Sequence, residues 1–77
     1  MQYESGEIIR TGDVVILHGM SGYVVFCIET NDYSDDYPEA HWSYLGEGIG
    51  ILTEEAGLIH IQSHEDLVLV RHAISRT

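Results

Sequence analysis

The sequence contains no lysine, and its three basic residues are Arg10, Arg71 and Arg76, against 13 aspartates and glutamates. The net charge of the 77-residue chain is therefore −10 at pH 7. Binding to a nucleic-acid backbone requires lysines and arginines that neutralise phosphates and release counterions. We expect no direct binding to DNA or RNA, and we expect a basic protein partner to be attracted instead. A simpler interpretation is that the acidity only keeps a small protein soluble.

Cysteine and long apolar runs are also scarce. The single cysteine, Cys27, excludes an intramolecular disulfide and an all-cysteine metal site, and its apolar neighbours predict a small buried side chain. The longest unbroken apolar run, residues 24–28, is too short to cross a bilayer, so we expect no membrane association. The N-terminus lacks the basic start and apolar stretch of a secretory signal, which favours a cytoplasmic protein.

Strand signals dominate the rest of the chain, whose length fits one domain over residues 1–77. Runs of β-branched and alternating apolar residues predict five strands, at residues 13–18, 23–30, 48–54, 58–62 and 66–71. Turns are expected between them, including one at residues 19–22, which has glycine at both ends. Residues 1–9 and 73–77 are expected to be loosely held ends.

The second predicted strand is apolar on both faces. Its alternate residues should point to opposite sides of the sheet, Val24, Phe26 and Ile28 to one side and Tyr23, Val25 and Cys27 to the other. This pattern predicts a central strand. Glycines 46, 48 and 50, at the start of the third strand, are expected to permit a bend or bulge in the sheet.

The acidic loop, residues 29–45, reads ETNDYSDDYPEAHWSYL and has five carboxylates in its first eleven residues. Pro38 suits the first position of a short helical turn, with Glu39 in its first turn and Gly46 as its stop. Trp42 and Leu45 are three residues apart, so both are expected to face inward over an open end of the sheet.

Five short strands with glycine-marked turns predict a mainly β fold, closed into a small barrel. Residues 12–15, GDVV, followed by residues 22–25, GYVV, resemble the start of SH3-like barrels of the KOW and Tudor kind, over roughly residues 10–30. The resemblance implies a five-stranded SH3-like barrel, in which the short helical turn predicted above lies in the long loop after the second strand. Members of that group that bind RNA use basic loops, which this chain lacks. By size, charge and β layout the whole chain also resembles the small acidic immunity proteins that neutralise bacterial toxins.

The acidic and histidine residues do not form a recognisable metal or catalytic motif. An EF-hand that begins at Asp32 would place Tyr37 at its turn glycine and Ser43 at its closing glutamate, although an irregular calcium site stays open. His60 and His64 fall on a strand and its following turn, where four-residue spacing does not bring them to one face. His18 could approach His60 only if the fold places them together. No serine lies in a strained nucleophile turn. We therefore predict no metal, no cofactor and no enzyme activity.

Recognition by the acidic loop is the remaining hypothesis, since tyrosines anchor interfaces and carboxylates speed association with a basic surface. The predicted partner-binding residues are Asp32, Tyr33, Asp35, Asp36, Tyr37, Glu39 and Tyr44. The opposing interpretation is that the loop aromatics pack inward to complete the small core, and Trp42 is expected there.

These features predict a non-enzymatic binding protein, in its concrete form an immunity protein or antitoxin that neutralises a basic toxin. One alternative is an accessory SH3-like module of a larger assembly, or a homodimer, that pairs through an exposed strand edge. Another is an acidic mimic of DNA that blocks a nucleic-acid-binding enzyme.

Overall fold

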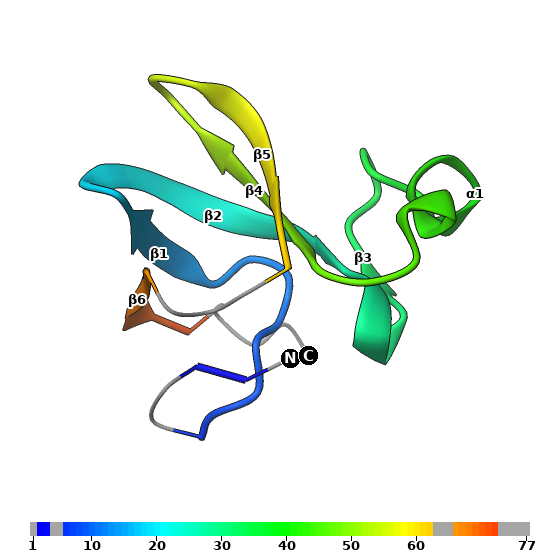
Figure 1. Cartoon of the computed structure of the whole chain (residues 1–77), viewed down its shortest axis with the longest axis horizontal. Coiled ribbons are helices and arrows are strands. Elements are labelled where there is room, and N and C mark those ends of the chain that lie inside the picture. The colour runs from blue at the N-terminus through cyan, green and yellow to red at the C-terminus, as the bar shows by residue number, and fades with distance from the viewer. Residues whose placement is uncertain (1, 4–5, 63–65, 73–77) are drawn as a thin grey trace.

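A computed structural model describes residues 2–3, 6–62 and 66–72 (Figure 1). In this part of the chain the strands are β1 (Val14–Leu17), β2 (Met20–Cys27), β3 (Asp32–Tyr33), β4 (Ile49–Thr53), β5 (Gly57–Ile61) and β6 (Leu67–Arg71). The helical elements are the 3₁₀ turns η1 (Ile28–Thr30) and η2 (Ser43–Leu45) and the helix α1 (Glu39–Trp42). The fold is mainly β, as predicted.

All the described strands belong to one antiparallel sheet with the order β5-β4-β2-β1-β6, and β3 pairs with the end of β2. Each of the five predicted strands corresponds to one of these, and the two-residue β3 is additional. β2 is central, as predicted. The prediction of a closed barrel is wrong for the described residues, because β5 and β6 form the two ends of the sheet and do not pair with each other.

The N-terminal segment takes part in the core, which corrects the expectation of a loosely held end. Tyr3 and Ile9 are buried in the main hydrophobic cluster, where they join side chains of β1, β2, β4 and β6. A short antiparallel bridge between Gln2 and Ile8 folds this segment back on itself. Residues 73–77, expected to be a loose end as well, lie outside the described residues.

A bulge in β2 divides the interior into two clusters. The β2–β4 register shifts between Val24 and Phe26, so Val25 is an extra residue with no partner in β4. After such a bulge the alternation of faces changes. Val24 and Cys27 therefore belong to the main cluster, whereas Val25, Phe26 and Ile28 form the second one. The predicted strict alternation along β2 is wrong for this reason, while the prediction that Cys27 is buried is confirmed.

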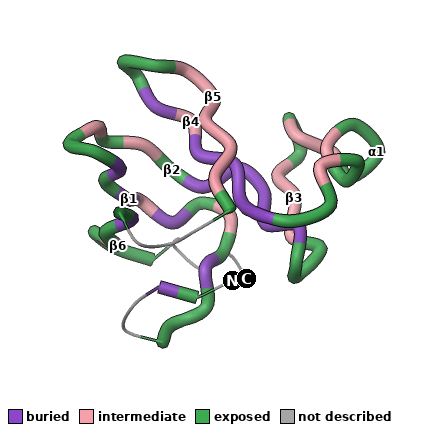
Figure 2. The backbone as a smooth tube through the Cα atoms, in the orientation of Figure 1, coloured by how far each residue is buried: buried purple, intermediate pink, exposed green. Residues whose placement is uncertain are grey.

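Gly50 is what allows Phe26 to occupy its place opposite the bulge. Phe26 pairs with Gly50 across β2 and β4, and its ring lies over the glycine. An ideal Cβ at Gly50 would lie 2.5 Å from Phe26 Cζ and 2.6 Å from Cδ2, far inside van der Waals contact. The predicted bulge near these glycines is confirmed. Figure 2 shows the resulting burial of β4 and the end of β2, in contrast to the exposed turns.

The β1–β2 hairpin turns earlier than predicted. His18 and Gly19 both have left-handed backbone conformations, with φ of 51° and 80°, and β2 already begins at Met20. Two central residues with positive φ define the turn that best matches the twist of paired strands. The predicted turn at residues 19–22 is wrong in this respect, since Ser21 and Gly22 pair with β1 and extend the hairpin.

Candidate functional site

Two carboxylates at the start of the acidic loop hold its backbone in place. Asp32 accepts hydrogen bonds from the backbone N–H and the hydroxyl of Thr11, at 2.9 and 3.0 Å. Glu29 accepts one from the backbone N–H of Gly48, at 3.0 Å. Asn31, with a positive φ of 52°, ends the η1 turn between them. Asp32 was predicted to bind a partner, and the structure places both of its oxygens on the protein itself.

Three aromatic side chains of the loop gather around Phe26. Trp42 stacks on its ring at a centroid distance of 5.3 Å, and Tyr33 stacks at 6.2 Å. Tyr37 lies tilted against both rings, 6.5 Å from Phe26 and 5.7 Å from Trp42. Leu45 packs against the same cluster. The inward orientation predicted for Trp42 and Leu45 is confirmed, and the loop is thereby a cover over the second cluster.

The hydroxyl of Tyr33 is the one buried side-chain polar atom without a hydrogen-bond partner among the described residues. Burial raises the pKa of this phenol, and the carboxylate of Glu39 raises it further. An unpaired buried hydroxyl costs about 1–3 kcal/mol. Tyr33 therefore stays neutral, and its ring serves the packing on Phe26.

The helical turn that carries the remaining candidates begins one residue later than predicted. Pro38 is extended and lies just before α1, so Glu39 is the first helical residue and is in the first turn, as predicted. The 3₁₀ turn η2 follows directly, and Gly46, with a φ of 84°, ends it. Trp42 anchors this turn on the second cluster, and Figure 1 shows α1 beside β3, to one side of the longer strands.

Four of the seven predicted partner-binding residues lie at the surface. Asp35, Asp36, Glu39 and Tyr44 are exposed, and Tyr44 has 76% of its surface accessible. The other three are the anchored Asp32 and the two tyrosines that pack on Phe26. The structure thus leaves three carboxylates and one large aromatic side chain exposed on a loop that is anchored by hydrogen bonds and by packing on Phe26.

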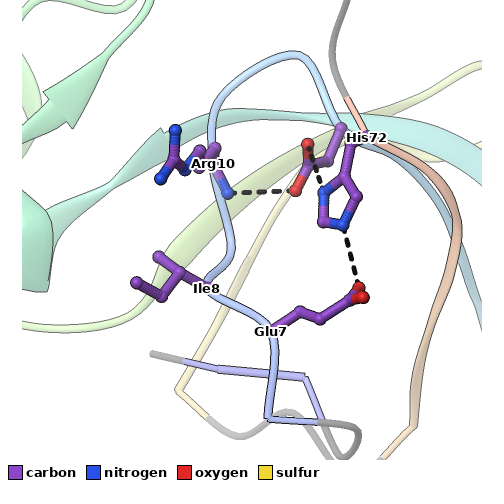
Figure 3. Close-up of a pocket in the computed structure, with 5 residues that line it drawn as sticks. Glu7, Ile8, Arg10 and His72 are labelled. Carbon is purple, nitrogen blue, oxygen red and sulfur yellow. Dashed lines mark hydrogen bonds and ion pairs between the residues drawn. The ribbon is translucent and has the colours of Figure 1, made fainter.

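A second polar cluster, absent from the sequence predictions, surrounds Asp13 (Figure 3). Asp13 is fully buried, and its carboxylate accepts hydrogen bonds from the Tyr3 hydroxyl at 2.7 Å and from the backbone N–H of Arg10 at 3.0 Å. His72 Nδ1 lies 3.5 Å from Asp13, and its Nε2 lies 2.8 Å from Glu7. A buried carboxylate persists only when it is paired in this way. The cluster therefore ties the N-terminal segment to the end of β6.

The hydrogen bonds and ion pairs within this cluster limit the reactions in which its side chains could take part. Both ring nitrogens of His72 face carboxylates, so neither is directed at a nucleophile. Burial raises the pKa of Tyr3 far above its ordinary range, and its hydrogen bond to Asp13 adds to the shift, so the phenol donates and does not ionise. A shallow cavity of about 350 Å³ lies beside these residues, with Ile8 and Arg10 in its wall, and Figure 3 shows the Arg10 side chain directed away from His72.

One sequence signal could have indicated this cluster. Asp13 directly precedes a run of four apolar residues that forms β1, a position where an unpaired carboxylate would be buried at high cost. The identity of its partners could not be read, because Tyr3 and His72 are separated from it by 10 and 59 positions.

The histidines occupy separate places. His60 Nε2 lies 2.8 Å from the backbone oxygen of Glu47 and its ring stacks on Phe26, whereas His18 lies 3.5 Å from Asp66 at the other end of the sheet. His64, considered as a partner of His60, lies outside the described residues. Within the described ranges, no group of three or more His, Cys, Asp and Glu side chains could hold a metal ion.

Comparisons with known proteins identify no relative from which the role of this site could be inferred. No protein-family model, no curated protein and no solved structure matches the chain. The described part of the chain also has no helix with the length and apolar character needed to cross a membrane.

Proposed function

We propose that this protein is a non-enzymatic binding protein that docks on a basic protein through the outer side of its acidic loop. The concrete form of the proposal is an immunity protein or antitoxin that neutralises a basic toxin. The contact residues are Asp35, Asp36, Glu39 and Tyr44. The carboxylates pair with lysines and arginines around the partner's active site, and Tyr44 enters a pocket between them.

The observation that carries the proposal is the combination of charge and anchoring in this loop. The three carboxylates are exposed, in a chain of net charge −10. Their backbone is held by the hydrogen bonds of Asp32 and by the stacking of Trp42 on Phe26. A loop that is ordered before binding loses little conformational entropy when it docks. An exposed tyrosine and exposed carboxylates on the same loop supply an anchor and electrostatic steering.

The test begins with capture of the partner from the native host at low salt, followed by stepped salt elution and mass spectrometry. The association rate of the purified partner is then measured with the Asp35→Lys, Asp36→Lys double variant. We expect the rate to fall by about tenfold or more, and to fall steeply with salt for the natural protein, because steering depends on the charges near the contact. Far-UV circular dichroism and Trp42 fluorescence check that the variant is folded.

The matched control is the Glu55→Lys, Asp66→Lys double variant, which makes the same change in net charge at exposed sites away from the loop. It should slow association much less. If both variants slow association equally, the protein's overall charge and not the loop steers the partner. If neither variant changes the rate, the acidic loop is not the docking surface.

A second candidate is favoured by one specific observation, the apolar exposure of a strand at the end of the sheet. Val68 and Val70 of β6 are 57% and 53% exposed, and β6 ends the described sheet. We propose as the alternative an accessory SH3-like module, or a homodimer, that adds a strand to β6. The strand order of the five longer strands supports an SH3-like arrangement. Strand addition by another protein should depend little on salt, whereas a homodimer of two chains of net charge −10 should tighten as salt is added. Val68→Lys should abolish either form, and the loop variant should not.

A further inference from the structure

The outer face of the sheet is apolar well beyond the area that the acidic loop covers. Cross-strand partners point to the same side of a sheet, and Tyr23 of β2 pairs with Val14 of β1 and with Leu52 of β4. These three side chains therefore form a row across the sheet. The loop packs on the other end of β2, around Phe26, so Tyr23 stays 46% exposed.

A groove of about 510 Å³ lies on this face. It is lined by Val14, Ser21, Gly22, Tyr23, Leu52, Thr53 and Glu54. Its volume is within the range of about 300–1,000 Å³ typical of ligand sites. β2 and β4 approach closely beside the groove, since an ideal Cβ at Gly22 would lie 2.6 Å from the carbonyl oxygen of Leu52. A larger residue there would force β2 and β4 apart.

The charge of the groove selects its occupant. Glu54 is exposed and is the charged residue among those that line the groove, whereas Arg71, the partner of Val14 on β6, is not among them. A ligand that fits places an apolar group against Tyr23 and Leu52 and a cation near Glu54. A second copy of the chain does not meet this requirement, because it would bring two such carboxylates and two net charges of −10 together.

We infer that the groove binds a short segment of a partner protein that carries an apolar side chain next to a lysine or arginine. The apolar side chain packs on the exposed ring of Tyr23 and on Leu52, and the cation pairs with Glu54. Tyr23 can also receive the cation on its ring face. This surface is separate from the exposed carboxylates of the acidic loop, and it shares with the loop only the second cluster, against which Leu52 also packs.

The test uses the full chain and capped tetrapeptides that alternate leucine with lysine, compared with the same peptides in which glutamate replaces lysine. Binding is followed by amide NMR spectra. The lysine peptide should move the signals of Ser21, Tyr23 and Glu54 and reach saturation, and the glutamate peptide should not. Glu54→Gln should weaken binding about two- to fivefold, as expected for one exposed ion pair. Tyr23→Thr, which keeps strand propensity, should weaken it about tenfold.

The matched control is Glu55→Gln, the neighbouring exposed carboxylate that does not line the groove. It should leave binding unchanged, and so should the loop variant with lysine at positions 35 and 36. Equal weakening by Glu54→Gln and Glu55→Gln, or equal binding of both peptides, would overturn the inference. So would an absence of saturable binding, or signals of the groove that change with protein concentration alone, which would identify a second copy as the occupant.

Discussion

The contact between Gly50 and Phe26 gives the sharpest prediction for the fold. Gly50 is not among the glycines with positive φ, so its backbone conformation is one that alanine can also adopt. Where no clash intervenes, glycine-to-alanine replacement stabilises a protein by about 0.4–1 kcal/mol, because the unfolded chain loses freedom. At position 50 the new Cβ would instead fall 2.5 Å from Phe26 Cζ. A rise in the free energy of unfolding of Gly50→Ala would therefore indicate no clash with Phe26, and a fall would indicate the clash.

The magnitude follows from the geometry of the second cluster. Carbon atoms in contact prefer about 3.5–4.0 Å, so the ring edge of Phe26 would have to retreat by about 1 Å. The ring is held between Trp42, Tyr33 and Tyr37, and cannot move without displacing them. Overpacking of this kind costs about 1–3 kcal/mol. For a domain of this size, each kcal/mol lowers the melting temperature by about 4–8 °C.

The natural protein reports this change through its single tryptophan. Trp42 stacks on Phe26, so its fluorescence follows unfolding of the second cluster in urea. Gly50→Ala should lower the urea midpoint, and the free energy of unfolding obtained from it should fall by about 1–3 kcal/mol. In a double-mutant cycle, Phe26→Leu should relieve part of the loss, because the shorter side chain leaves room for the added methyl group.

Two outcomes would refute this reasoning. A Gly50→Ala protein as stable as the natural one, or more stable, would mean that Phe26 does not lie over the glycine. Strict additivity of Gly50→Ala and Phe26→Leu would mean that the two positions are not in contact. If the single variant fails to fold, recovery of folding in the double variant still supports the contact.

Two further predictions concern the buried Tyr3–Asp13 contact and the turn between β1 and β2. Tyr3→Phe should lower the free energy of unfolding by about 1–3 kcal/mol at neutral pH, because Asp13 loses a hydrogen bond in a buried site. Since the pKa of Tyr3 is raised in the folded state, folded protein keeps a proton that the unfolded chain releases above about pH 10, so stability falls as pH rises past that point. Urea melts across this range should show a smaller alkaline loss for Tyr3→Phe, and an equal loss would contradict the assignment. His18→Asn should raise stability by about 0.5–1 kcal/mol, since asparagine before Gly19 suits a turn with two positive φ angles. A lower melting temperature for His18→Asn would show that the exposed contact with Asp66 outweighs the turn.

The acidic loop shows which parts of the candidate site could be predicted from the sequence. The sequence identified the loop by its carboxylates and aromatic residues, and it placed Trp42 inward because of its spacing from Leu45. The sequence predicted the same partner-binding role for Asp32 and Asp36. In the structure Asp32 binds Thr11, whereas Asp36 is exposed. These two aspartates have the same local chemistry. Only the position of the turn at Thr11, 21 residues earlier in the chain, distinguishes them.

The sheet shows the same division. Strand positions followed from local patterns of β-branched residues, which depend on a few neighbours along the chain. The bulge at Val25 depended on a contact between Phe26 and a glycine 24 positions later, and it reversed the faces that alternation had assigned. The burial of Tyr3 likewise depended on Asp13 and on the end of β6.

By itself, the sequence determined the mainly β character, the central position of β2 and a surface of net charge −10, because these follow from composition and local periodicity. The tertiary structure decided that the described sheet stays open and which carboxylates are anchored or exposed. It also decided that a groove forms beside Tyr23. The physical reason is that pairing, burial and steric fit join residues that are distant in the chain, and local preferences carry no information about which of them will meet.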